Sequence, residues 1–132
     1  MDASVAAVLH SYPAPVRERL IWLRALILKT AAKTPGVGPI EETLKWGEAS
    51  YLTSASGSGT TVRIGRDKRT GQPAFYVNCQ TNLVERYRTL YTDAFTYDGA
   101  RGVVIGEQPD EAVLEHMIAL ALTYHAAKKR RG

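Results

Sequence analysis

Residues 60–79 read TTVRIGRDKRTGQPAFYVNC, in which two alternating segments flank a basic loop at residues 65–72. The alternation has a period of two residues, which is the side-chain period of a β-strand. It predicts strands at residues 60–64 and 73–79, joined as a hairpin. One face of this pair carries Val62, Ile64, Phe75, Val77 and Cys79, and the other carries Thr61, Arg63, Ala74, Tyr76 and Asn78. We expect the first face to be buried and the second to be open.

Helical patterns on both sides of this hairpin predict the layer that covers it. The apolar spacing of residues 16–28 indicates a central core helix, preceded by a shorter helix at residues 4–10. Asn82 resembles the start of a capping box and predicts a helix at residues 83–91. A terminal helix is expected from Pro109 onward.

The segment between the core helix and the hairpin contains two further predicted elements. Pro39 can open a third, short helix at residues 39–47, with Glu41 and Glu42 near its positive end. Gly47 would end that helix as its C-cap. A short strand is expected at residues 50–53.

A second hairpin is expected at residues 95–105, because Asp98-Gly99 favours a tight primed turn. Strands therefore come as hairpins between helices, which is typical of α+β proteins. We predict a single domain over residues 1–132, an antiparallel sheet of about five short strands packed by N- and C-terminal helices. Residues 103–105 would form an exposed apolar edge, and we expect the terminal helix or a second copy, in a homodimer, to cover it.

The composition is that of an ordinary globular domain. The chain has 132 residues, of which 45% are hydrophobic and 23% charged, with a net charge of +4. No segment approaches the ~20 apolar residues that a membrane span requires, and the N-terminus lacks the basic and apolar parts of a signal peptide. The single cysteine, Cys79, excludes an internal disulfide. We therefore expect a cytoplasmic protein.

Basic residues gather in the Arg63–Arg69 segment and in a tail at residues 128–132. The Lys128–Arg131 cluster follows the terminal helix, where cations suit the helix dipole. The alternative is that the loop and the tail contact phosphate, so that the chain acts as a nucleic-acid or acidic-protein adaptor. Aromatic residues are not interleaved with the basic ones, which favours two solvated segments.

No catalytic, metal or cofactor pattern stands out. Residues 57–61 lack the Gly-Lys-Ser/Thr ending of a phosphate loop and lead into a strand. His116 and His125 lie nine residues apart and point to opposite sides of one helix. Cys79 shares a strand face with Phe75, so we expect an inert core thiol. A hydrolase or isomerase with unrecognised acid–base groups is a further possibility, and its available carboxylates are Glu42, Glu48, Asp93 and Asp98.

A binding site is the interpretation that remains. Trp46 and Tyr51 bracket Gly47, and aromatic walls with a few polar groups are typical of small-molecule pockets. Arg101 offers a fixed positive charge for an anionic ligand. We predict a non-catalytic domain, without metal or cofactor, whose pocket binds a small or anionic ligand. Its predicted residues are Glu42, Trp46, Tyr51, Arg63, Tyr76, Asn78 and Arg101.

Three segments carry a family resemblance: KWGEASY at residues 45–51, FYVNCQT at 75–81 and IALALTYH at 118–125. With them, residues 12–128 resemble the YdhG-like bacterial domains, a family largely of unknown function. The chain departs from the family pattern at Ala49, where proline is usual. The resemblance implies the α+β fold.

One branch of that family is described as a frataxin-like iron chaperone. For function, the resemblance therefore implies iron handling. Iron sites of that kind need clustered carboxylates. The long N-terminal helix instead carries Glu18 as its only acid, beside Arg17, Arg19, Arg24 and Lys29. We therefore do not extend the iron role to this chain.

Overall fold

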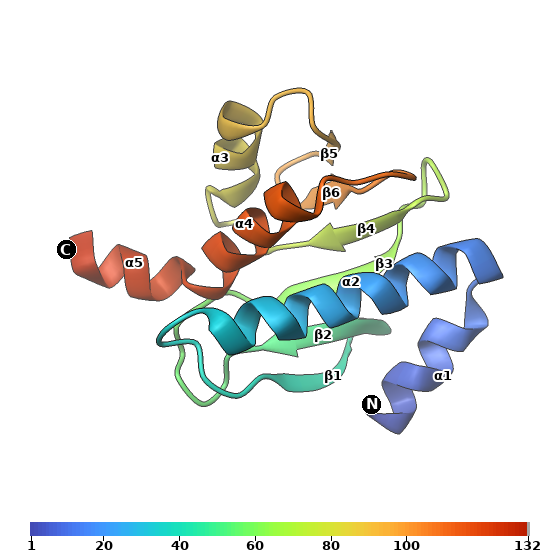
Figure 1. Cartoon of the computed structure of the whole chain (residues 1–132), viewed down its shortest axis with the longest axis horizontal. Coiled ribbons are helices and arrows are strands. Elements are labelled where there is room, and N and C mark those ends of the chain that lie inside the picture. The colour runs from blue at the N-terminus through green and yellow to red at the C-terminus, as the bar shows by residue number, and fades with distance from the viewer. Residues whose placement is uncertain (132) are drawn as a thin grey trace.

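The computed structural model describes residues 1–131, with side chains through residue 129. This part of the chain forms a six-stranded sheet with α2 and α4 lying across one face (Figure 1). The helices are α1 (Ala3–Ser11), α2 (Ala14–Lys33), α3 (Leu83–Leu90), α4 (Glu111–Leu122) and α5 (Tyr124–Arg131). The strands are β1 (Glu41–Lys45), β2 (Glu48–Leu52), β3 (Val62–Arg66), β4 (Pro73–Tyr76), β5 (Thr96–Asp98) and β6 (Gly102–Val104). The predicted α+β class is confirmed.

The strand order is β1-β2-β3-β4-β6-β5, and every neighbouring pair is antiparallel. The hairpin predicted at residues 60–79 is β3 and β4, in which Arg63 pairs with Tyr76 and Ile64 with Phe75. β6 pairs with β4 on one side and with β5 on the other. The second predicted hairpin therefore joins the sheet through its later strand.

The core lies between the sheet and the two long helices. Ile64 and Phe75 are fully buried on the face that α2 and α4 cover. Leu23 and Ile27 of α2 and Met117 of α4 are buried against the same cluster. α2 has proline in its first turn, where the missing N–H costs nothing, and runs without interruption to Lys33. One side of the sheet is thus closed by helices.

The short helix predicted at residues 39–47 is wrong, because residues 41–45 form β1. Trp46 and Gly47 make the two-residue turn to β2, with φ of 56° and 77°. Both values lie in the left-handed region, as a type I′ hairpin requires. A helix of nine residues is only marginally stable by itself, whereas pairing with β2 satisfies the backbone groups of residues 41–45. The sheet gains its sixth strand in this way.

The exposed apolar edge predicted at residues 103–105 is also wrong. Val103, Val104 and Ile105 are buried because β6 lies inside the sheet. The outer strands of the sheet are β1 and β5. The edge that motivated the predicted homodimer is therefore not available, and the homodimer stays a prediction without that support.

The predicted terminal helix is confirmed but has a break at Thr123. Asp110 caps α4 by accepting a hydrogen bond from the backbone nitrogen of Val113 at 3.2 Å. α5 then carries the basic tail away from the sheet (Figure 1). Lys128 and Lys129 are exposed, whereas the side chains of residues 130–131 and Gly132 lie outside the described residues. Among the described residues, no helix is both long and apolar enough to cross a membrane.

Candidate functional site

The face of the sheet opposite α2 and α4 carries a row of functional side chains. The register aligns Ser50, Arg63, Tyr76, Gly102 and Asp98 across five neighbouring strands. These positions alternate with the core residues of the same strands, so their side chains leave the sheet on the other side. The second face therefore carries Arg63 and Tyr76, as predicted, but it is only partly open, because Tyr76 is buried there in a small cluster with Ala74 and Val104.

A cavity of about 560 Å³ lies on this face. Its walls come from three connections: the β1–β2 turn, the β3–β4 loop and the β5–β6 turn. Glu48, Arg63 and Tyr76 form its floor on adjacent strands. The full lining is Trp46, Glu48, Arg63, Arg66, Asp67, Lys68, Arg69, Tyr76, Asp98 and Arg101. A volume of this size suits a small molecule.

The lining has five cationic and three anionic side chains, a formal excess of two positive charges. Glu48 pairs with Arg63, and Asp98 pairs with Arg69, each at 3.5 Å. Asp67 is buried, and its carboxylate accepts hydrogen bonds within the β3–β4 loop.

The Asp67 carboxylate accepts hydrogen bonds from the backbone nitrogen and the hydroxyl of Thr70, at 2.9 and 2.8 Å. Burial opposes ionisation of Asp67, yet these bonds lower its pKa. Among the described residues, Arg66, Lys68 and Arg101 line the cavity without a carboxylate within salt-bridge distance. The uncompensated charge of the cavity is therefore positive.

Tyr76 positions two cations of the cavity lining, Arg63 and Arg101. The guanidinium carbons of Arg63 and Arg101 lie 6.0 and 5.5 Å from the centroid of its ring. A guanidinium over an aromatic ring is attracted by the electron-rich face of the ring, which restrains its position. Burial raises the pKa of Tyr76 to about 12, with further contributions from Asp67, Glu48 and Asp98. The phenol is therefore a hydrogen-bond donor at neutral pH.

Glu48 is the unusual acid of the cavity. Its carboxylate lies against Gly65 on β3, where a Cβ atom at residue 65 would overlap Oε2. Burial raises the pKa of Glu48, although the nearby charges of Arg63, Arg101 and Lys68 oppose the shift. Glu48 is thus a half-buried carboxylate that shares its cations with any anion entering the cavity.

Trp46 stands at the rim. The residue is 89% exposed, the most of any large hydrophobic residue among those described. It lines the main cavity and also a second hollow of about 320 Å³ on the same side of the sheet. Arg63 and Arg101 line both hollows and separate them. The second hollow also contains Lys45, Thr60, Thr61, Asn78 and Cys79.

The inert core thiol predicted at Cys79 is wrong, because this residue is exposed. The strand ends at Tyr76, two residues after Ala74, so the alternation does not reach position 79. The Asn78 side chain instead accepts a hydrogen bond from the backbone nitrogen of Gln80 at 2.8 Å, which organises a turn. Cys79 lies in this turn and faces the second hollow.

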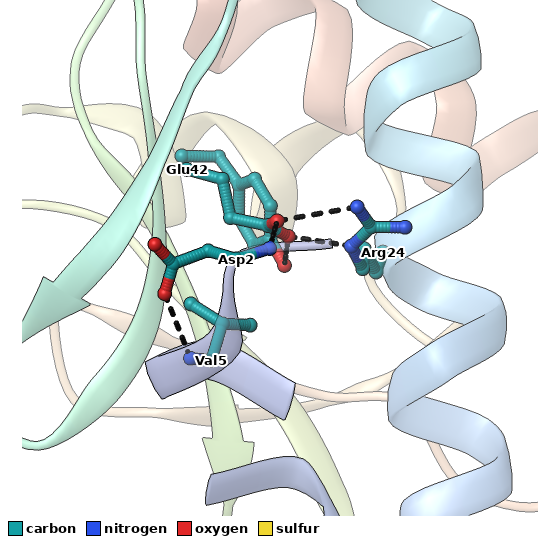
Figure 2. A network of polar contacts seen from close by, with 5 residues as sticks. Asp2, Val5, Arg24 and Glu42 are labelled. Atoms are coloured by element: carbon teal, nitrogen blue, oxygen red, sulfur yellow. Dashed lines mark hydrogen bonds and ion pairs between the residues drawn. The ribbon is translucent and has the colours of Figure 1, made fainter. Parts of the chain in front are cut away.

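Glu42 and Tyr51 lie on the opposite side of the sheet from the cavity. They pair across β1 and β2 on the helix-covered face, and Tyr51 is fully buried. The Tyr51 hydroxyl donates to Glu42 at 2.9 Å, and Arg24 of α2 donates to the same carboxylate at 2.5 and 3.2 Å. Figure 2 shows the Glu42 carboxylate between Arg24 and the backbone nitrogen of Asp2.

This network fixes the ionisation of its members. Burial would raise the pKa of Glu42, but the hydrogen bonds from Arg24, Asp2 and Tyr51 lower it to about 2. Burial and the neighbouring Glu42 carboxylate raise the pKa of Tyr51. Glu42 and Tyr51 tie β1, β2 and α2 together, and neither reaches the cavity. Tyr51 was included in the predicted site because it brackets Gly47 together with Trp46, and Glu42 because it lies near the same junction.

Five of the seven predicted residues do meet on the open face, namely Trp46, Arg63, Tyr76, Asn78 and Arg101. The prediction omitted Glu48 and Lys68. Glu48 has the same strand parity as Ser50, which places it on the face of Arg63. That parity was the signal that would have identified it. Among the described residues, no group of three or more His, Cys, Asp or Glu side chains could hold a metal ion.

Comparison with protein-family models, with curated proteins and with solved structures gives no match. The resemblance to the YdhG-like domains therefore stays a prediction.

Proposed function

We propose that this chain is a non-catalytic binding domain for a small anionic ligand, which the open-face cavity holds. The observation that carries the proposal is the excess of cations in the cavity. Arg101 and Lys68 line it from two different connections, and neither has a carboxylate partner among the described residues. Unpaired cations that line one concave surface favour the binding of an anion there.

Three features of the cavity support a small ligand. Its volume of about 560 Å³ lies within the range of small-molecule sites. Tyr76 and Arg101 are held in place by their stacking contact, so little ordering is needed on binding. The Tyr76 hydroxyl supplies a neutral donor beside the cations. We infer that the ligand contacts Arg101, Lys68 and Tyr76.

Calorimetric titration with sulfate tests this proposal, because sulfate keeps its charge across the accessible pH range. We expect Arg101→Gln and Lys68→Gln each to weaken sulfate binding about tenfold, the equivalent of losing one charge-assisted contact. Lys29→Gln is the matched control, since Lys29 is an exposed cation on α2, on the other side of the sheet. Equal losses in all three variants would show that only the net charge matters, and the proposed site would be wrong.

A nucleic-acid adaptor is the second candidate. The sequence suggested that stacking aromatics are separate from the basic loop, yet Trp46 lines the same cavity as Lys68 and Arg69. Such binding would weaken steeply with salt. Retention of single-stranded DNA or RNA at low ionic strength, lost in Lys68→Gln but not in Lys29→Gln, would support it.

The proposal includes a cytoplasmic location. The free thiol of Cys79 fits the reducing conditions of that compartment. It does not include the iron role that the resemblance implies. Catalysis is not part of it either, although Glu48 is a carboxylate with a raised pKa in a cavity.

A further inference from the structure

The backbone of Trp46 has an unusual conformation. Trp46 is the described residue other than glycine that has a positive φ, at 56°. The first position of a two-residue primed turn favours Asn, Asp or Gly, because these residues tolerate the left-handed region. A bulky side chain there is a strained outlier. The turn does not require an indole at this position.

The exposure of Trp46 adds to this. An indole that is 89% exposed contributes nothing to the core, and it leaves a large apolar surface in water. Strain and exposure coincide at the rim shared by two hollows whose linings both have an excess of cations. Residues held in a strained conformation at such a place are associated with ligand contacts.

Trp46 is also the available aromatic face in the main cavity. The other aromatic in its lining is Tyr76, whose ring already has the guanidinium groups of Arg63 and Arg101 beside it. A flat ring entering the cavity would therefore stack on the indole of Trp46.

We propose, on the basis of the proposed function, that the anionic ligand is a 5′-mononucleotide. Its phosphate lies between Arg101 and Lys68, and its base stacks on Trp46. A phosphate monoester carries close to two negative charges at neutral pH, which matches the excess of two positive charges in the lining. A nucleobase supplies a flat ring that can stack on the exposed indole.

The lining favours one nucleotide over a strand. Proteins that bind single strands present aromatic residues for successive bases along a basic groove. Here a single aromatic residue is free for stacking among the residues of the two hollows. The basic loop and Trp46 surround one cavity.

Calorimetry with the full chain separates the ring from the phosphate. The probes are the 5′-monophosphates of adenosine, guanosine, cytidine and uridine, with ribose 5-phosphate as the anion that has no base. We expect at least one nucleotide to bind about tenfold or more tightly than ribose 5-phosphate, the scale of one stacked base. Trp46→Asn should remove this advantage and leave ribose 5-phosphate affinity unchanged. Arg101→Gln should weaken both classes of probe.

Two controls keep the result interpretable. Asn suits the left-handed position, so Trp46→Asn should keep its fold and lose no thermal stability. Trp22→Phe removes the other indole, which lies on α2 away from the cavity, and should change no affinity.

Three outcomes would overturn this inference: no nucleotide binds better than ribose 5-phosphate, the advantage survives in Trp46→Asn, or a mixed-sequence octanucleotide binds more than a hundredfold more tightly than the best mononucleotide. The last would assign the cavity to a nucleic-acid strand. If ribose 5-phosphate binding still depends on Arg101, the proposed anion site stands although the nucleotide fails. If no probe binds in an Arg101-dependent way, both proposals fail.

Discussion

The Glu48 carboxylate lies against the Cα of Gly65 on the neighbouring strand, in the space that a Cβ atom at residue 65 would occupy. Gly65 does not have a positive φ, so the backbone does not require glycine at this position. The missing side chain is what allows Glu48 to lie flat on the sheet beside Arg63. The cavity thus contains an anion of its own.

The Glu48 carboxylate should compete with a bound anion, which makes anion affinity depend on pH. Burial raises the pKa of Glu48, so lowering the pH protonates it before an exposed acid and removes the competing charge. We expect the sulfate affinity of the wild type to rise about three- to tenfold between pH 7.5 and 5.0, the size of one neighbouring charge. Calorimetry measures this directly.

Glu48→Gln should bind sulfate more tightly at pH 7.5 and lose most of the pH dependence. Gly65→Ala should have the same effect by pushing the carboxylate away, at little cost in stability because a flexible side chain can move. An unchanged pH profile in Glu48→Gln would show that another group is responsible.

Replacing Trp46 should stabilise the fold. Trp46→Asn relieves the left-handed strain at φ of 56°, and we expect a gain of about 1 kcal/mol in the free energy of unfolding, since the left-handed region costs ordinary residues about that much. Urea denaturation provides the measurement. Trp46→Val should lose stability instead, because a β-branched residue tolerates this conformation poorly. A loss in Trp46→Asn would mean that the indole supports the turn.

Glu42→Gln should destabilise the protein at neutral pH by about 2 kcal/mol, the scale set by a large pKa shift in a mostly buried ion pair. The folded pKa of Glu42, about 2, lies below the ordinary value of 4.5. Its contribution is therefore complete above pH 4.5 and is lost as the pH falls toward 2. Urea denaturation at pH 7 and 2.5 should show the difference between wild type and variant shrinking.

Glu41→Gln is the matched control for this pair, because Glu41 is exposed on the other side of the same strand. Its effect should stay within about 0.5 kcal/mol. A Glu42→Gln penalty that is equal at both pH values would assign the effect to packing and not to charge.

Cys79 should react with a thiol reagent in the native state, because it is exposed. We expect modification at a rate close to that in urea, and slower modification when the cavity is occupied, since Arg63 and Arg101 line both hollows. The release of thionitrobenzoate from Ellman's reagent follows the reaction. A requirement for denaturant would contradict the exposed position.

The sequence predicted the fold class because its hairpin and its core helices have strong periodicity. The alternation at residues 60–79 assigned the two faces correctly, because Ile64 and Phe75 lie in the core under the helices and Arg63 and Tyr76 lie on the opposite face. It failed at Cys79, where the strand had already ended, and at Ala74 and Tyr76, which are buried on the face that was expected to be open. Strand ends depend on pairing with neighbouring strands, which local periodicity does not contain.

The first hairpin could not be predicted for a different reason. Pro39 and the two glutamates that follow it are local helix signals. Trp46 is not among the residues that turn rules favour in a left-handed position. Pairing of β1 with β2 overrides both signals. The error hid the pairing of Glu42 with Tyr51, which places both on the helix-covered face, and it concealed Glu48 as the neighbour of Arg63.

Chemical-shift mapping during a sulfate titration tests the central claim most directly, because it shows where on the molecule the anion binds. We predict that the backbone amides with the largest shifts belong to the Trp46 turn, the loop at residues 66–69, and Arg101. Helix α2 should be unaffected on its outer face. Shifts that concentrate on α2 or α5, with none near Arg101, would contradict the claim that the open face of the sheet is the binding site.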